Sequence, residues 1–210
     1  MFNNWWLEDA PKHWKVVKFK HVFEFQNNVS FNPEPVVLSL TLKGLVVRDI
    51  SSNEGQLAES YENYALVKPG DFVLNPMDLV SGSVAISQHE GVVSNAYFVF
   101  RVRESRANEI EPRFMELYFF IGYKRNILFP FGKGLGRPEQ GGGRWTLNRE
   151  TLSDFPILIP PIDEQRRLVG LVDRKLALID EQLGVLSQLE IQLKEQRNVE
   201  IASAVLNGGN

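Results

Sequence analysis

Basic residues alternate with glycines in residues 132–144, and this segment has the clearest potential for chemistry in the sequence. Lys133, Arg137 and Arg144 lie among six glycines. Such cations neutralise phosphates, and arginine also forms paired hydrogen bonds with the O6 and N7 atoms of guanine. Glycines let a backbone turn tightly and come close to a ligand. The segment therefore predicts a loop, rather than the interior of a helix or strand, that is suited to contact with nucleic acid.

The charge distribution agrees with this interpretation. The chain has a formal net charge of -3, yet residues 101–149 carry ten Lys and Arg against five Asp and Glu. A basic middle within an acidic chain predicts a local phosphate-binding surface, although a solvated face of mixed charge gives the same pattern.

Other polar residues near expected turns are further candidates for contact with nucleic acid. Lys43 and Arg48 flank a short strand-like run, and Asn75 and Ser81 lie around a polar turn. Arg125 follows a helix that we expect to end near residue 123, where a basic residue also suits the helix dipole. The candidate contacts are therefore Lys43, Arg48, Asn75, Ser81, Arg125, Lys133, Arg137 and Arg144. Trp145 is expected to pack in the core of the domain, and the alternatives are that it braces this loop or stacks on a ligand.

Enzyme signatures are present only as partial matches. The segment Asn75–Asp78 resembles the Asn/Asp-Pro-Pro-aromatic motif of amino-methyltransferases, but it lacks the second proline and the aromatic residue. The Gly-x-Gly-x-Gly pattern at 132–136 is followed by proline instead of a helix that would direct amides at a phosphate. The three histidines lack metal-ligand spacing, and there is no cysteine. We predict a binding protein with no catalytic residue, and no metal or cofactor bound by this chain.

Residues 1–158 have the pattern of a mixed α/β globular domain. Short β-rich runs recur at 35–40, 71–74, 83–86 and 97–102. Turns are expected at Pro69-Gly70-Asp71 and Glu90-Gly91, and a helix is expected to start at Pro112.

Residues 159–210 differ from this domain. After two prolines, Asp163 is placed to cap a helix, and no proline occurs from Glu164 to Leu206. Apolar residues lie three or four apart along one side of that helix, which is close to a heptad repeat. They are Leu168, Val172, Leu176, Ile179, Leu183, Leu186, Leu189 and Leu193. The 43 residues would form a rod of about 65 Å, and its apolar seam needs a partner. The alternative is two shorter helices that fold back near Gly184.

The location of the protein is inferred from what the sequence lacks. The N-terminus has no signal-peptide pattern, and no apolar run approaches the roughly 20 residues that span a bilayer. Together with the absence of cysteine, this predicts a cytoplasmic protein without contact with a membrane.

Four segments of the chain resemble the specificity subunits of type I restriction-modification systems. The segment Ile159–Gln165, leading into a long amphipathic helix, is similar to their conserved apolar-Pro-Pro-apolar-x-Glu-Gln junction. The opening Ala10–Trp14 and the stretch Val67–Asp78 also look like this family, as does Thr146–Asn148.

The resemblance implies an α+β fold and a role in DNA recognition. Family members usually have two target-recognition domains, each followed by such a helix, and the helices pair as an antiparallel coiled coil. Modification subunits bind this assembly and methylate adenine at N6 with S-adenosylmethionine, and restriction subunits join the same complex. The specificity subunit itself holds no catalytic site. S-adenosylmethionine is therefore expected on the partner subunit.

This sequence departs from the family pattern because it has one recognition domain, 1–158, and one helical region, 159–210. The sequence leaves open whether the chain is a half-length subunit or a fragment. Both cases favour a homodimer that reads a bipartite double-stranded DNA sequence. The alternative function is a helix-mediated assembly module that does not bind DNA. A third alternative, an enzyme such as a methyltransferase or nuclease, lacks the expected cofactor loop and acidic metal cluster.

Overall fold

The computed structural model describes residues 5–41, 44–49, 60–79, 82–134 and 145–207. These residues divide into two compact units, which span residues 1–166 and 167–210 of the chain. The fold is α+β with a long C-terminal helix, as the sequence predicts. The functional boundaries 1–158 and 159–210 remain a prediction, because they concern roles rather than packing.

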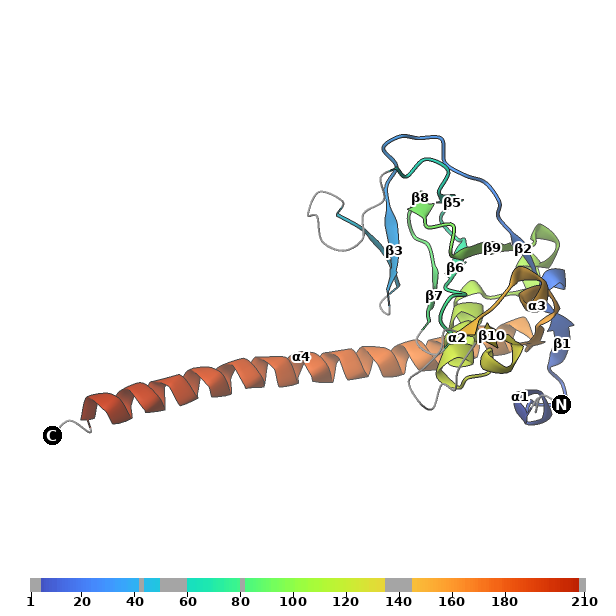
Figure 1. The fold of residues 1–210 in the computed structure, drawn as a ribbon. Helices are drawn as coiled ribbons and strands as arrows, with labels where there is room; N and C mark the ends of the chain where they lie inside the picture. Colours follow the sequence, from blue (N-terminus) through green and yellow to red (C-terminus); the bar gives the residue numbers. More distant parts are fainter. Residues whose placement is uncertain (1–4, 42–43, 50–59, 80–81, 135–144, 208–210) are drawn as a thin grey trace. The chain divides into compact units, whose positions relative to one another are not determined.

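The first unit contains short strands and helices, and it ends in the first turns of the long C-terminal helix (Figure 1). In chain order its strands are β1 (Lys15–Lys18), β2 (Phe23–Phe25), β3 (Leu38–Thr41), β4 (Gly44–Val47), β5 (Ala65–Val67), β6 (Phe72–Leu74), β7 (Val84–Ile86), β8 (Gly91–Val93), β9 (Phe98–Val102), β10 (Lys133–Gly134), β11 (Trp145–Thr146) and β12 (Pro156–Ile159). The helices are α1 (Trp5–Glu8), α2 (Pro112–Lys124), α3 (Arg149–Asp154) and α4 (Ile162–Asn207), with 3₁₀ turns η1 (Phe19–His21), η2 (Glu104–Glu109) and η3 (Phe129–Phe131).

A four-stranded antiparallel sheet of order β2-β9-β6-β7 organises the core, and both of its faces are covered. Because successive side chains on a strand point to opposite faces, Phe72 and Phe100 face one way and Val73 and Val99 the other. Phe72 and Phe100 stack across β6 and β9 with ring centroids 5.3 Å apart. Phe119 of α2 packs on the same face, 5.7 Å from Phe100.

The opposite face of this sheet packs against two smaller antiparallel pairs, β3-β4 and β5-β8. Leu38, Val67 and Val93 from these strands form a buried cluster with Val73 and Val99. The central strands are therefore buried on both faces, which explains their continuous apolar sequence.

The two expected turns have different outcomes. Gly70 has a φ of +87°, and Asp71 N donates to the Lys68 carbonyl oxygen at 3.0 Å, so the turn there is confirmed. The expected turn at Glu90-Gly91 is wrong, since Gly91 begins β8. Glycine is needed there because a Cβ would lie 2.5 Å from the Val36 carbonyl oxygen.

Strands β1 and β12 pair antiparallel, with Lys15 opposite Ile159 and Lys18 opposite Pro156. The pairing places the start of the domain beside its end, just before α4 begins. Helix α4 is one continuous element of 46 residues that passes through Gly184, so the alternative of two short helices is wrong. It begins at Ile162, and Asp163 therefore lies in its first turn rather than before it.

Candidate nucleic-acid interface

The turn that follows β6, residues 75–79, is held against β11 by backbone hydrogen bonds. Leu147 N donates to the Pro76 carbonyl oxygen at 2.8 Å, and Leu79 N donates to the Trp145 carbonyl oxygen at 3.2 Å. These bonds fix a polar turn next to the strand pair β10-β11.

Asn75 is anchored within this turn through both its side chain and its backbone. Its Oδ1 accepts a 2.9 Å hydrogen bond from Met77 N, and its carbonyl oxygen accepts one from the Tyr123 hydroxyl. Burial, followed by the nearby charge of Asp78, raises the pKa of Tyr123. Tyr123 therefore stays neutral and keeps its donor proton at physiological pH.

Two glycines allow the segments around this turn to approach closely. A Cβ on Gly82 would lie 2.1 Å from the Asp78 carbonyl oxygen and 2.5 Å from Cε1 of Tyr123. A Cβ on Gly132 would lie 2.5 Å from Cδ1 of Leu79. Side chains at either position would push apart the turn, the end of α2 and the start of β10.

Two basic candidates lie on the segments that adjoin this turn. Arg125 is the exposed residue directly after α2, and its N–H donates to the Ile121 carbonyl oxygen at 2.8 Å. Lys133 is exposed in β10, where it pairs with Thr146. The expectation that Lys133 lies in a loop is therefore wrong, because this pairing gives it extended backbone. The structure brings together the segments that carry Asn75, Arg125 and Lys133.

The remaining candidates are separated from this group or lie outside the described residues. Lys43, Ser81, Arg137 and Arg144 are outside them. The described neighbours Thr41 and Ser83 are in contact, since Ser83 Oγ donates to the Thr41 carbonyl oxygen at 3.3 Å.

Arg48 follows the opposite end of the β3-β4 hairpin. Its N–H donates to the Val37 carbonyl oxygen at 2.8 Å. The register pairs Thr41 with Gly44 and Leu38 with Val47. Arg48 is therefore half-buried at the open end of the hairpin, away from the end that contacts Ser83.

Sequence reasoning missed a polar cavity formed by side-chain amides and one arginine. It is lined by Gln26, Asn27, Asn28, Asn95, Tyr97 and Arg149, together with three small apolar residues. Three consecutive amide residues at 26–28 were a usable signal, but their proximity to Asn95 and Arg149 depends on contacts distant in the sequence.

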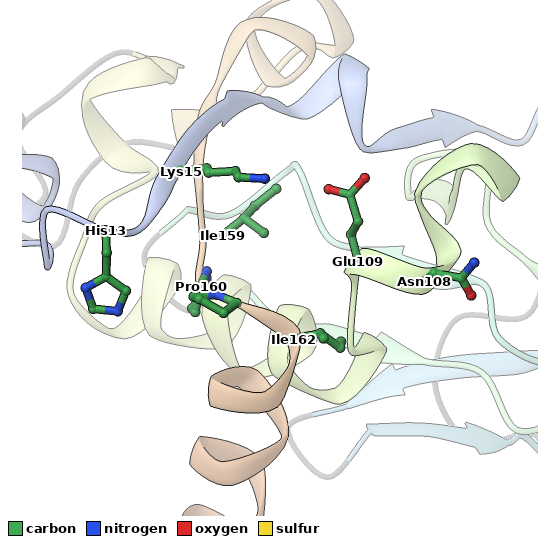
Figure 2. Close-up of a pocket in the computed structure, with 8 residues that line it drawn as sticks. His13, Lys15, Asn108, Glu109, Ile159, Pro160 and Ile162 are labelled. Atoms are coloured by element: carbon green, nitrogen blue, oxygen red, sulfur yellow. The ribbon is translucent and has the colours of Figure 1, made fainter.

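A second hollow lies where β12 leads into α4 (Figure 2). Figure 2 shows the side chains of Lys15 and Glu109 pointing toward one another across it, with Ile159 beneath Lys15. His13 points away from these two, and its Nε2 lies 2.8 Å from Oε2 of Glu164. The lining pairs a cation with a carboxylate, so it does not favour phosphate.

Gln165 is fully buried in the first turns of α4 and holds that end of the helix by three hydrogen bonds. Its Oε1 accepts from Glu111 N at 2.9 Å. Its Nε2 donates to the carbonyl oxygens of Glu109 at 2.9 Å and Pro160 at 2.8 Å. The Glu-Gln pair of the junction therefore supplies Glu164, whose side chain contacts His13, and a buried anchor, Gln165.

The expected apolar seam lies on α4, and most of it is exposed. Leu168 and Val172 are half-buried. The other six side chains are between 41% and 60% exposed, and they are Leu176, Ile179, Leu183, Leu186, Leu189 and Leu193.

A second apolar row runs beside this seam and was not predicted. Leu171, Leu178 and Val185 recur every seven residues, and each is between 42% and 61% exposed. Each lies one residue before a seam residue, and one residue along a helix corresponds to a rotation of about 100° around its axis. The apolar face of α4 is thus wider than a two-helix seam needs.

Two kinds of site were not found in the part of the chain that the structure describes. No group of three His, Cys, Asp or Glu residues there could hold a metal ion. No helix within the described ranges is long and apolar enough to cross a membrane.

The fold is similar to that of a solved chain from a study of a type I restriction-modification system. One chain, from a study titled "Structural basis underlying complex assembly and conformational transition of the type I R-M system", aligns over 89% of the present chain with a TM-score of 0.54 and 19% identity. The HsdS subunit from Thermoanaerobacter tengcongensis aligns over 86% with a TM-score of 0.49 and 19% identity. The present chain spans 44% and 40% of the lengths of these two chains.

The sequence itself identifies the family. The profile of the type I restriction modification DNA specificity domain matches residues 11–201. The chain therefore belongs to this family, as the junction and opening motifs indicated. A comparison with curated proteins gives no match.

Proposed function

We propose that this chain is a DNA-binding specificity subunit of a type I restriction-modification system. Residues 1–158 act as a target-recognition domain that binds one half-site in double-stranded DNA. Residues 159–210 form the helical region that pairs with a second copy. The family match over 11–201 supports this assignment, and the exposed apolar seam of α4 is the structural observation that carries it.

The seam favours a homodimer. Burying a leucine side chain contributes about 1.5–3 kcal/mol, and six seam residues are largely exposed in the single chain. A second α4 that runs antiparallel would cover them by knobs-into-holes packing. Because the two domains are then attached at opposite ends of the helix pair, the dimer would read two half-sites.

Helix length gives the expected geometry of the target. At about 1.5 Å per residue, the 46 residues of α4 extend about 69 Å. A turn of B-DNA is about 34–36 Å, so the helix covers nearly two turns. We expect a palindromic bipartite target whose half-sites are read from one side of the duplex.

The second apolar row supports recruitment of modification subunits. An antiparallel partner covers one seam, and Leu171, Leu178 and Val185 would stay exposed beside it. A row of this kind suits a helix of another subunit. In this proposal the modification subunit carries S-adenosylmethionine and methylates adenine at N6. Restriction subunits join the complex, and the present chain is not catalytic.

Selection from random duplex DNA tests the proposal. The purified chain, with its modification subunit, is incubated with random duplexes near 100 mM salt, and the bound fraction is sequenced. We expect two short inverted half-sites at a fixed separation. Failure to bind any duplex even at low salt, with the dimer intact, would instead establish an assembly module without DNA binding.

A further inference from the structure

The polar cavity between β2, β9, β8 and α3 is lined mainly by side-chain amides. Its volume is about 200 Å³, and it takes side-chain amides from Gln26, Asn27, Asn28 and Asn95. Arg149 is the charged residue among those that line it, and none of the described lining residues is Asp or Glu. The cavity therefore offers several paired donors and acceptors with a single positive charge.

Arg149 is held in one orientation at the edge of this cavity. Its guanidinium lies 5.1 Å from the ring centre of Phe25 and 5.5 Å from that of Phe98, within range of cation–π attraction. Its Nη1 donates to Oδ1 of Asn27. A guanidinium has five N–H groups, so donors remain for a ligand after this contact.

The amides stand on backbone that is fixed by hydrogen bonds to neighbouring strands. Gln26 N donates to the Val99 carbonyl oxygen at 2.8 Å, and Leu66 N donates to the Asn28 carbonyl oxygen at 2.9 Å. Such fixed backbone lowers the entropic cost of presenting polar groups to a ligand.

The side chains on this backbone differ in how far they are already engaged. Asn95 Nδ2 is held by the Asn63 carbonyl oxygen at 2.9 Å. The side-chain amide of Asn28, by contrast, is exposed and makes no hydrogen bond within the described residues. Asn28 is therefore the amide most available to a ligand.

The balance of donors and acceptors distinguishes two parts of a duplex. A phosphate offers acceptors alone, so the amide carbonyl oxygens of Gln26, Asn28 and Asn95 would find no donor there, whereas that of Asn27 already accepts from Arg149. Base edges in the major groove carry donors and acceptors side by side, and Asn or Gln pairs with adenine while Arg pairs with guanine. The lining is therefore complementary to base edges rather than to the backbone.

We propose that this cavity is a base-reading site, in which Asn28 and Arg149 contact the edge of a base pair in the target. The proposal rests on the DNA-binding function proposed above and adds residues outside the basic segment to it. Asn28 donates and accepts through its amide, Arg149 donates through its guanidinium, and Asn27 positions Arg149.

The test compares base preference at each position of the selected target. Dissociation constants are measured for the best duplex and for duplexes with each single base-pair change, using wild type, Asn28→Ala and Arg149→Lys. Asn28→Ala removes an uncommitted side chain, so it keeps the fold, and Arg149→Lys keeps the charge. Gln88→Ala is the control, because Gln88 is exposed and lies before β8, whereas Asn95 follows that strand.

We expect Asn28→Ala and Arg149→Lys to lose a preference of about tenfold at one or two adjacent positions, with the others and the salt dependence unchanged. Uniform weakening at every position with a smaller salt slope would mean a phosphate contact and would overturn the base-reading site. Wild-type preferences in both variants would also overturn it while leaving DNA binding established. If wild type binds no duplex, the proposed function itself fails.

Discussion

The side-chain oxygen of Gln165 accepts a 2.9 Å hydrogen bond from the backbone N–H of Glu111, which lies 54 residues earlier in the chain. The Gln165 amide nitrogen donates to two further carbonyl oxygens, those of Glu109 and Pro160. One buried side chain thus satisfies three backbone groups at the place where the recognition domain passes into α4.

Replacing this glutamine should destabilise the first unit. Gln165→Ala leaves one buried and two part-buried backbone groups without these partners, and a buried group left unsatisfied costs about 1–3 kcal/mol. Allowing for entry of water, we expect the free energy of unfolding to fall by about 2–4 kcal/mol. All four tryptophans precede residue 166, so urea unfolding followed by tryptophan fluorescence reports on this unit.

Gln188→Ala is the matched control, because Gln188 is an exposed glutamine on the side of α4 away from the seam. We expect its free energy of unfolding to change by less than about 0.5 kcal/mol. Equal effects of the two substitutions would contradict the anchoring role of Gln165.

Local patterns explain which parts of this architecture could be predicted. Helix α4 follows from a repeat of three and four residues without proline, and β4 was expected at Gly44–Val47 from its sequence alone. These elements depend on neighbours in the sequence. The pairing of Lys15 with Ile159 joins opposite ends of the domain and leaves no periodic signal.

The candidate site was predicted less well for the same reason. Lys133 was expected in a loop because glycines surround it, yet its backbone pairs with Thr146. Arg149 and Asn95 gave no signal in the sequence, since their relation to Asn28 arises only from the packing of β2, β8 and α3. The residue types in the sequence indicated contact with nucleic acid, but only the fold shows which of these residues lie together.

The proposed dimer should depend on the seam rather than on the apolar residues beside it. We expect the double variant Ile179→Ser, Leu186→Ser to dissociate into monomers at micromolar concentration. Each serine removes a large apolar side chain from the helix interface, at a cost of about 2–5 kcal/mol for each chain. Sedimentation equilibrium measures the change in mass.

Leu178→Ser, Val185→Ser provides the comparison, because these residues belong to the second row and each is at least as exposed as the seam residue that directly follows it. We expect this variant to remain a dimer but to lose binding of the modification subunit in a pull-down with purified proteins. If this variant dissociates as readily as the seam variant, the proposal that the two rows have separate roles is wrong.

The basic residues near the turn at 75–79 should contribute to affinity without changing base preference. Lys133→Ala and Arg125→Ala each remove one phosphate contact in the proposed complex. The slope of log K against log salt should therefore become smaller by about one for each. Lys68→Ala, an exposed lysine on the turn before β6, should leave this slope unchanged. A loss confined to one base pair would instead assign a base contact to that residue.

Alkaline pH should destabilise the domain through Tyr118. Its hydroxyl donates to the Pro156 carbonyl oxygen at 3.3 Å, and burial raises the pKa of Tyr118 to about 12. The neutral form is favoured in the folded state, so the contribution of Tyr118 to stability is fully present below the unfolded pKa of about 10. It is lost as pH rises from about 10 to 12.

The Tyr118 contribution can be isolated with a phenylalanine variant. Between pH 10 and 12, wild type should lose about 2 kcal/mol more than Tyr118→Phe, which has no proton to release. Unfolding in urea at each pH measures the difference. An equal loss of unfolding free energy in both proteins would show that other titrating groups cause the alkaline destabilisation.

Shortening α4 should shorten the spacer between half-sites. Deleting residues 173–186 removes two heptads, so the remaining seam residues keep their register, and the helix becomes about 21 Å shorter. With about 34–36 Å for 10–10.5 base pairs, the preferred spacer should contract by about six base pairs. Selection from random duplexes measures it, with circular dichroism and sedimentation confirming a helical dimer. An unchanged spacer in a variant that remains dimeric would show that α4 does not set the separation, because a rigid pair of shortened helices cannot hold two domains at the original distance.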